Sequence, residues 1–128
     1  MKVLKIDVKT KTVSEITIGK NLENIYKEIG NGCELFCCPI DFDFGDTLYA
    51  DDESLLRNDI EGCFMLPEWN HPIVGNALII GTDEEGDSED VKMTPDFLQK
   101  KLIWGNKQVA EQYRDYALSN MIENSNHF

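Results

Sequence analysis

The most acidic stretch of the chain follows directly on an apolar run. Residues 77–90 read ALIIGTDEEGDSED, and a short loop rich in side-chain oxygens is what Ca²⁺ binds in proteins. If an EF-hand loop began at Asp83, Glu85 and Asp87 would take its third and fifth positions. Ser88, however, stands where that loop needs glycine, and Thr94 where it needs its closing glutamate. We predict an exposed turn whose charge a partner binds, with a weak surface site for a divalent ion as the alternative.

Cysteine and histidine are the residues that would carry nucleophilic or zinc chemistry. Cys63 and His71 could meet across a loop as a thiol and its base, and a zinc site would need Cys33 and Cys37 as well. The spacing matches neither signature, because the chain has no Cys-x-x-Cys pair and its histidines are far apart. Free cysteines packed as small apolar side chains are the simpler interpretation, so we predict no catalytic residue, no metal and no cofactor. The cysteines and histidines are Cys33, Cys37, Cys38, Cys63, His71 and His127.

Trp69 lies in a segment, residues 51–72, that shows no sustained periodicity. Long irregular connections in a compact domain often carry function. A tryptophan in such a segment is either a buried anchor of the loop or an exposed contact of the kind enriched at binding hot spots. We predict that Trp69 and His71 bind a partner together with four residues of the acidic turn. These four are Asp83, Glu84, Glu85 and Asp87.

Charge is distributed unevenly along the 128 residues. The net charge is -12, to which residues 41–90 contribute -14, from fifteen acidic residues and one arginine. Residues 1–20 contribute +3, residues 21–40 contribute -2 and residues 91–128 contribute +1. Direct binding to nucleic acid is disfavoured, because it needs a basic face. The complementary partner is a protein with a basic surface, and the simpler alternative is that the acidic loops serve solubility alone.

Alternating apolar residues predict the strands. Residues 3–8 and 13–18 are predicted to form a hairpin around a polar turn, because Leu4, Ile6 and Val8 lie on one face at a period of two. Pro39 either ends the strand that begins at Cys33 or places it at an edge of the sheet. The run from residue 76 to 82 is apolar on both faces and is predicted to be a central strand. The five predicted strands cover residues 3–8, 13–18, 33–40, 47–50 and 76–82.

Capping residues predict where the helices begin and end. Asn21 and Gly30 flank the segment LENIYKEI in the positions of an N-cap and of the glycine that follows a last turn. Thr94 and Pro95 begin a second helix, which continues to an interruption at Gly105. The fold class is therefore α+β, with an antiparallel or mixed sheet of about five strands covered by helices on one face.

A last helix follows Gly105 and forms a C-terminal extension, residues 105–128, of one domain over residues 1–128. It either closes the core or packs against a second copy of the chain as a homodimer. Its apolar stripe consists of Val109, Tyr113, Tyr116, Ala117 and Met121.

The compartment is predicted from two absences in the sequence. No apolar run approaches the ~20 residues that a membrane-spanning helix needs, so no membrane partner is expected. Residues 1–13 alternate between apolar and polar residues and do not read as a secretory signal. We predict a cytoplasmic protein with reduced cysteines.

Several of these segments together resemble a family of small domains of unknown function that is carried by phages, plasmids and bacteria. The resemblance covers residues 1–104 and leaves the C-terminal helix outside the family-like core. It is carried by the N-terminal hairpin and first helix, by the strand and acidic turn in PIVGNALIIGTDEEG, and by the helix from Pro95.

This resemblance implies a mobile-element context and carries no catalytic residues to this chain. With the clustered charge, it favours a non-enzymatic accessory protein that binds a host protein, in an anti-defence or nucleic-acid-mimic role. The alternatives are a small-molecule or nucleotide-binding domain or minor enzyme with its site in residues 51–72, and a structural subunit whose charge serves solubility alone.

Overall fold

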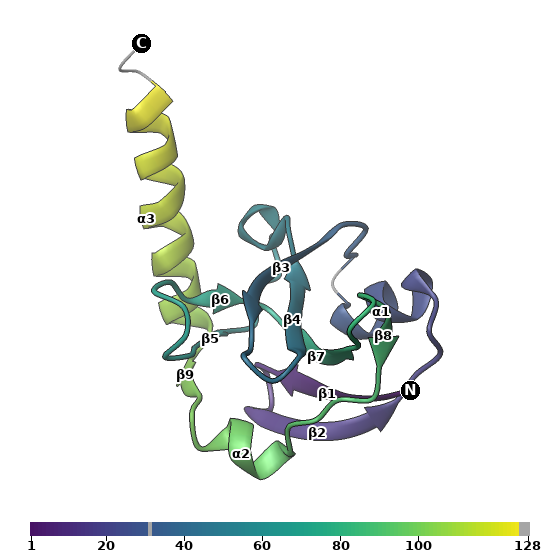
Figure 1. Ribbon diagram of the computed structural model, residues 1–128. Helices are drawn as coiled ribbons and strands as arrows, with labels where there is room; N and C mark the ends of the chain where they lie inside the picture. The colour runs from purple at the N-terminus through teal and green to yellow at the C-terminus, as the bar shows by residue number, and fades with distance from the viewer. Residues whose placement is uncertain (31, 126–128) are drawn as a thin grey trace.

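The computed structural model describes residues 1–30 and 32–125, with side chains as far as residue 120 (Figure 1). His127 and the side chain of Met121 therefore lie outside the described part of the chain. In chain order the elements are β1 (Lys2–Asp7), β2 (Thr12–Thr17), α1 (Leu22–Ile29), β3 (Phe36–Asp41), β4 (Asp46–Asp51), the 3-10 turn η1 (Ser54–Leu56), β5 (Cys63–Met65), β6 (Ile73–Val74), β7 (Ala77–Thr82), β8 (Ser88–Glu89), α2 (Pro95–Gln99), β9 (Ile103–Gly105) and α3 (Lys107–Ser125). None of the helices in this described part is both long and apolar enough to cross a membrane.

The larger sheet has six strands and is antiparallel throughout. Its order is β2-β1-β7-β4-β3, and the short strand β8 pairs with β7. The predicted α+β class is thus confirmed, and β7 is the central strand that its apolar sequence indicated. β3 lies at an edge, and the pairing with β4 is irregular between Cys37 and Ile40, on either side of Pro39. A proline is tolerated there because an edge position or a bulge leaves its missing N–H without a required partner.

Successive residues of the central strands point to opposite faces, and both faces are buried. On one face Val3, Leu78 and Ile80 pack against Ile25 and Ile29 of α1. This helix has the predicted caps, since the Asn21 side chain accepts a hydrogen bond from the N–H of Asn24 and Gly30 has a φ of 77°.

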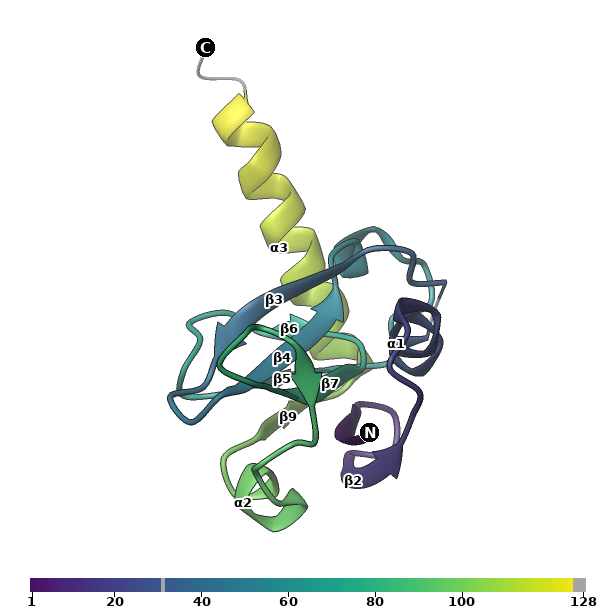
Figure 2. The same cartoon turned by 45° about the vertical axis from the view of Figure 1, so that its right-hand side comes forward.

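The other face of the larger sheet carries the main core. Leu4, Leu48 and Ile79 pack there against Phe64 of the smaller sheet and Leu98 of α2. Helices therefore lie on both faces of the sheet rather than on one, as the views from two directions show (Figures 1 and 2).

A second sheet takes one of its strands, β5, from the segment predicted to be irregular, residues 51–72. It has three antiparallel strands in the order β6-β5-β9, with Phe64 of β5 opposite Ile73 of β6 and Trp104 of β9. The prediction that the α2 helix runs on to Gly105 is wrong, because α2 ends at Gln99 and the chain returns as β9. Buried residues at Leu98 and Leu102 have helical spacing, but the second of them leads into a strand.

The C-terminal helix α3 has two parts with different surroundings. Near its start, Ala110 is fully buried beside Ile60, Cys63 and Val74, and Tyr113 packs on this cluster. Farther along, the helix projects away from both sheets (Figure 1), and Tyr116 is 65% exposed. The first turns thus help to close the core, which is one of the two roles predicted for this helix.

Candidate functional site

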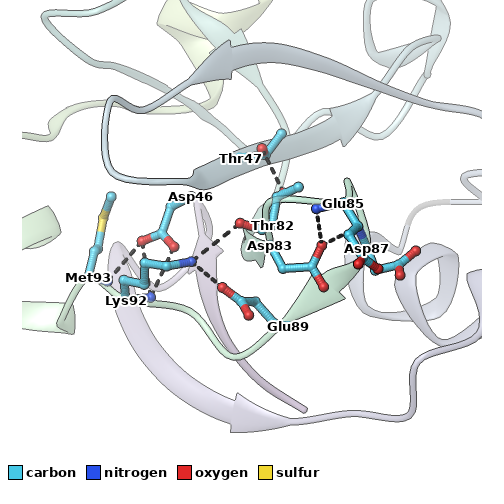
Figure 3. A network of polar contacts seen from close by, with 9 residues as sticks. All are labelled: Asp46, Thr47, Thr82, Asp83, Glu85, Asp87, Glu89, Lys92 and Met93. Atoms are coloured by element: carbon cyan, nitrogen blue, oxygen red, sulfur yellow. Dashed lines mark hydrogen bonds and ion pairs between the residues drawn. The ribbon is translucent and has the colours of Figure 1, made fainter.

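The predicted acidic residues lie in the turn that joins β7 to β8. The carboxylate of Asp83 accepts hydrogen bonds from the N–H groups of Glu85 and Asp87, each at 2.9 Å (Figure 3). The N–H of Gly86 bonds to the Asp83 carbonyl, and Gly86 has a φ of 87°, a conformation that favours glycine. Asp83 therefore shapes the turn, while Glu84, Glu85 and Asp87 expose their side chains.

A buried carboxylate lies close to this turn, on β4 opposite Gly81. Asp46 has no exposed surface, and its carboxylate accepts hydrogen bonds from the N–H groups of Lys92, at 3.0 Å, and Met93, at 2.8 Å (Figure 3). The Lys92 side chain in turn reaches the Glu89 carboxylate and the Thr82 carbonyl. These bonds hold the segment after β8 against β4 and so fix the position of the acidic turn.

The turn forms one wall of an open groove of about 530 Å³, which we call the acidic groove. Its opposite wall is the turn before β4, where Phe44 is 43% exposed. Phe44 stacks on Phe42, with ring centroids 6.0 Å apart, and meets the edge of Phe97, with centroids 6.3 Å apart. The residues lining the acidic groove are Phe44, Gly45, Thr82, Asp83, Glu84, Glu89 and Lys92.

Trp69 and His71 lie together in the loop between β5 and β6. Their ring centroids are 5.9 Å apart and the planes are inclined by 70°, an edge-to-face contact. Trp69 is 38% exposed, so the alternative of a fully buried loop anchor does not hold. Both rings line a second cavity of about 220 Å³, the tryptophan cleft, whose other walls include Cys37, Asp51, Asp52 and Tyr113.

The two groups of predicted binding residues do not form one surface. β4 and β7 run antiparallel, with Asp46 opposite Gly81 at one end and Ala50 opposite Ala77 at the other. The acidic groove lies at the first end, whereas Ala50 and Asp51 at the second end line the tryptophan cleft. The prediction of a single contact surface containing Trp69 and the acidic turn is therefore replaced by two separate candidates.

Cys63 and His71 do not line the same cavity. Cys63 is buried in the cluster beneath α3 rather than in the tryptophan cleft with His71, and burial raises the pKa of its thiol. Cys37 does line the cleft, but burial, with the charges of Asp52 and Cys38, raises its pKa to about 11. A thiol with a raised pKa is protonated at neutral pH and is a poor nucleophile. Among the side chains that the structure describes, no three metal-binding groups converge on one point.

Sequence reasoning did not identify three residues that shape these sites. Asp46 and Asp51 look like any other acids of the acidic region, although Asp51 is nearly buried and accepts hydrogen bonds from the Arg57 guanidinium at 2.9 and 3.3 Å. Their place in strand β4, whose other residues are apolar or small, was the available signal. Phe44 lies in a turn rich in aspartate, and an aromatic residue in such a polar turn was the available signal for it.

The fold and its two open sites define a small α+β domain built on a six-stranded antiparallel sheet. The chain belongs to the family DUF3846, a domain of unknown function, which matches residues 1–103. The resemblance to a domain of unknown function is thereby confirmed, and α3 follows the matched region. No curated protein and no solved structure matches the chain with significance.

Proposed function

We propose that this protein is a non-enzymatic binding protein of a phage or another mobile element, and that the acidic groove binds a host protein with a basic surface. The observation that carries the binding function is the exposed Phe44 ring beside the carboxylates of the acidic turn. The mobile-element context rests on the sequence resemblance described above.

The acidic groove has the composition of a protein-binding surface. Such surfaces combine a centre of exposed aromatic residues with a polar or charged rim. Phe44 and Phe97 are 43% and 47% exposed and lie in contact with each other, and the acidic turn forms the rim. An apolar group of the partner would cover these rings while its basic groups meet the carboxylates.

The charge available to a partner comes from the tip of the turn. Glu84, Glu85 and Asp87 are exposed and form no ion pair within the described part of the chain. Lys92 is the cation that lines the groove, and it is already paired with Glu89. Carboxylates presented in this way attract a basic surface over roughly a Debye length, about 10 Å at 0.1 M salt. A partner whose basic surface ordinarily holds nucleic acid would fit, which supports a nucleic-acid-mimic role.

The test is an affinity purification from host lysate with a variant that removes only the free charge. The variant E84Q/E85Q/D87N keeps Asp83, whose carboxylate holds the turn together. The matched control, E15Q/E23Q/E34Q, neutralises three exposed glutamates on residues 15–34 and changes the net charge equally. Bound proteins are identified by mass spectrometry at about 0.05 and about 0.3 M salt.

We expect one stoichiometric partner that the wild type and the control retain at low salt and that the groove variant loses. Retention of the same partner by all three proteins would contradict the role of the acidic groove.

A further inference from the structure

The tryptophan cleft is a second site, formed by four segments that are distant in the sequence. Cys37 comes from β3, and Asp51 and Asp52 are the last residue of β4 and the one that follows it. Trp69 and His71 come from the loop before β6, and Tyr113 comes from α3. Figure 1 shows β3, β6 and the base of α3 around this region. A cavity that depends on so many separate segments exists only in the folded chain.

The charge in the cleft is negative. Asp51 and Asp52 line it, and none of the lysines and arginines that the structure describes does. The Asp51 charge is compensated, because its carboxylate bonds to the Arg57 guanidinium and to the N–H of Glu53. The Asp52 carboxylate is exposed and forms no ion pair in the described part of the chain. One uncompensated carboxylate therefore remains at the wall of the cleft.

The rest of the lining is suited to an organic cation. Trp69 and Tyr113 supply aromatic rings, and a guanidinium or ammonium group is attracted to the face of such a ring. Leu55, Ile73 and Val74 supply an apolar wall against which the alkyl stem of a cation packs. An anionic ligand such as a nucleotide would be repelled by the Asp52 carboxylate, because no described lysine or arginine lines the cleft to offset that charge.

The size of the cleft limits the ligand further. Its volume of about 220 Å³ lies below the ~300 Å³ at which cavities for drug-sized molecules begin. A group of the size of an arginine or lysine side chain fits this space, and a dinucleotide or a folded peptide does not.

We propose that the tryptophan cleft binds an alkyl guanidinium or ammonium group, with Asp52 as its counter-ion and Trp69 as its aromatic wall. This inference is independent of the proposed function, because the cleft lies at the opposite end of β4 and β7 from the acidic groove. The cation belongs either to a small molecule or to a basic side chain of a protein, and the two sources offer the same chemistry.

The first experiment uses the fluorescence of Trp69 in the full-length W104F variant. Trp104 is the other tryptophan, and replacing it leaves an aromatic ring against Phe64. The variant is titrated with Nα-acetyl-L-argininamide, called argininamide below, and with Nα-acetyl-citrulline amide, called the citrulline amide, which has nearly the same shape and no charge. We expect saturable binding of argininamide in the millimolar range and binding of the citrulline amide at least about tenfold weaker.

Two further variants assign the charge. D52N is expected to weaken argininamide binding about tenfold, whereas E53Q, which neutralises the next residue and lies outside the cleft, should leave the affinity unchanged. No saturable binding of argininamide, equal affinity for the citrulline amide, or an unchanged affinity in D52N would each overturn the proposal.

A second readout does not depend on W104F folding. Cys37 lines the cleft, so argininamide should slow its alkylation by iodoacetamide in a C38S variant, measured by mass spectrometry at about pH 9. Protection by argininamide but not by the citrulline amide supports the proposal, and no protection by either contradicts it.

Comparing free argininamide with a capped five-residue peptide that contains one arginine identifies the source of the cation. Tighter binding of the peptide indicates a protein side chain, and tighter binding of the free compound indicates a small molecule.

Discussion

The acidic residues between positions 41 and 90 have different roles, which their sequence context does not distinguish. Asp46 is fully buried and accepts hydrogen bonds from two backbone N–H groups, and Asp83 holds the acidic turn together. Glu84 and Glu85, one and two residues later, are exposed. The difference lies in the direction in which each side chain leaves the backbone. Part of the charge therefore stabilises the fold, and the rest is free to meet a partner.

We expect D46A to destabilise the protein by about 3 kcal/mol. The substitution leaves the N–H groups of Lys92 and Met93 without their acceptor, and an unsatisfied buried group costs about 1–3 kcal/mol. The free energy of unfolding is measured by urea denaturation. The control is D43A, which removes an exposed aspartate from the preceding turn and should change stability by about 0.5 kcal/mol or less. Equal stabilities of the two variants would refute the structural role of Asp46.

The raised pKa of Cys37 predicts slow alkylation. Because the pKa is about 11 instead of 9.0, the thiolate fraction at pH 8 is about a hundredfold lower, which the greater nucleophilicity of the thiolate offsets in part. We expect alkylation about tenfold slower than that of a cysteine in an unstructured peptide. The rate should still be rising steeply between about pH 10 and about pH 11, whereas a rate that is half-maximal near pH 9 would show that the thiol is not perturbed.

At the scale of elements, the decisive contacts join segments that are far apart in the chain. β5 pairs with β6 and with β9, which are separated from each other by β7, β8 and α2. The start of α3 then covers the cluster formed by Ile60, Cys63 and Val74. The helix that follows the family-matched region thus completes the core of the domain.

The substitution A110D tests this role of α3. Ala110 is fully buried, and a charge placed there has no partner, so we expect a loss of at least about 2 kcal/mol in the free energy of unfolding. Q112D introduces the same charge into the same helix at an exposed position and should cost about 0.5 kcal/mol or less. Similar losses in both variants would show that α3 is not part of the core.

The elements that the sequence predicted are those specified by local chemistry. Asn21 and Thr94 accept the hydrogen bonds expected of N-caps, and the apolar run from Ala77 is the central strand. The second sheet was missed because β5, β6 and β9 are two or three residues long, which is too short for an alternation to register. The sequence did indicate Trp69, His71 and a site in residues 51–72, but it did not indicate that Cys37 and Tyr113 complete the walls of the tryptophan cleft, because these residues meet that segment only in the folded chain.

At the scale of the whole molecule, the negative charge is concentrated and the two sites lie apart. Residues 41–90 carry a charge of -14, whereas the whole chain carries a net charge of -12. These residues supply the acidic turn at one end of β4 and β7 and the aspartates of the tryptophan cleft at the other. Two ligands could therefore bind at the same time without contact between them.

Concentrated negative charge also predicts that salt stabilises the fold. Like charges repel one another in the compact state, and salt screens this repulsion. The urea midpoint should rise between about 0.01 and about 0.3 M NaCl. The rise should be smaller in E84Q/E85Q/D87N than in E15Q/E23Q/E34Q, because the first set lies among other acids. A midpoint that is independent of salt in the wild type would contradict this account of the charge.

The most direct test of the central claim is the affinity for the captured partner, measured by calorimetry over a range of salt concentrations. For the wild type and for E15Q/E23Q/E34Q, we expect the affinity to fall steeply as salt rises. For E84Q/E85Q/D87N, we expect weaker binding and a shallower dependence on salt. An affinity that is the same in all three proteins at every salt concentration would show that the charge of the acidic groove does not determine binding.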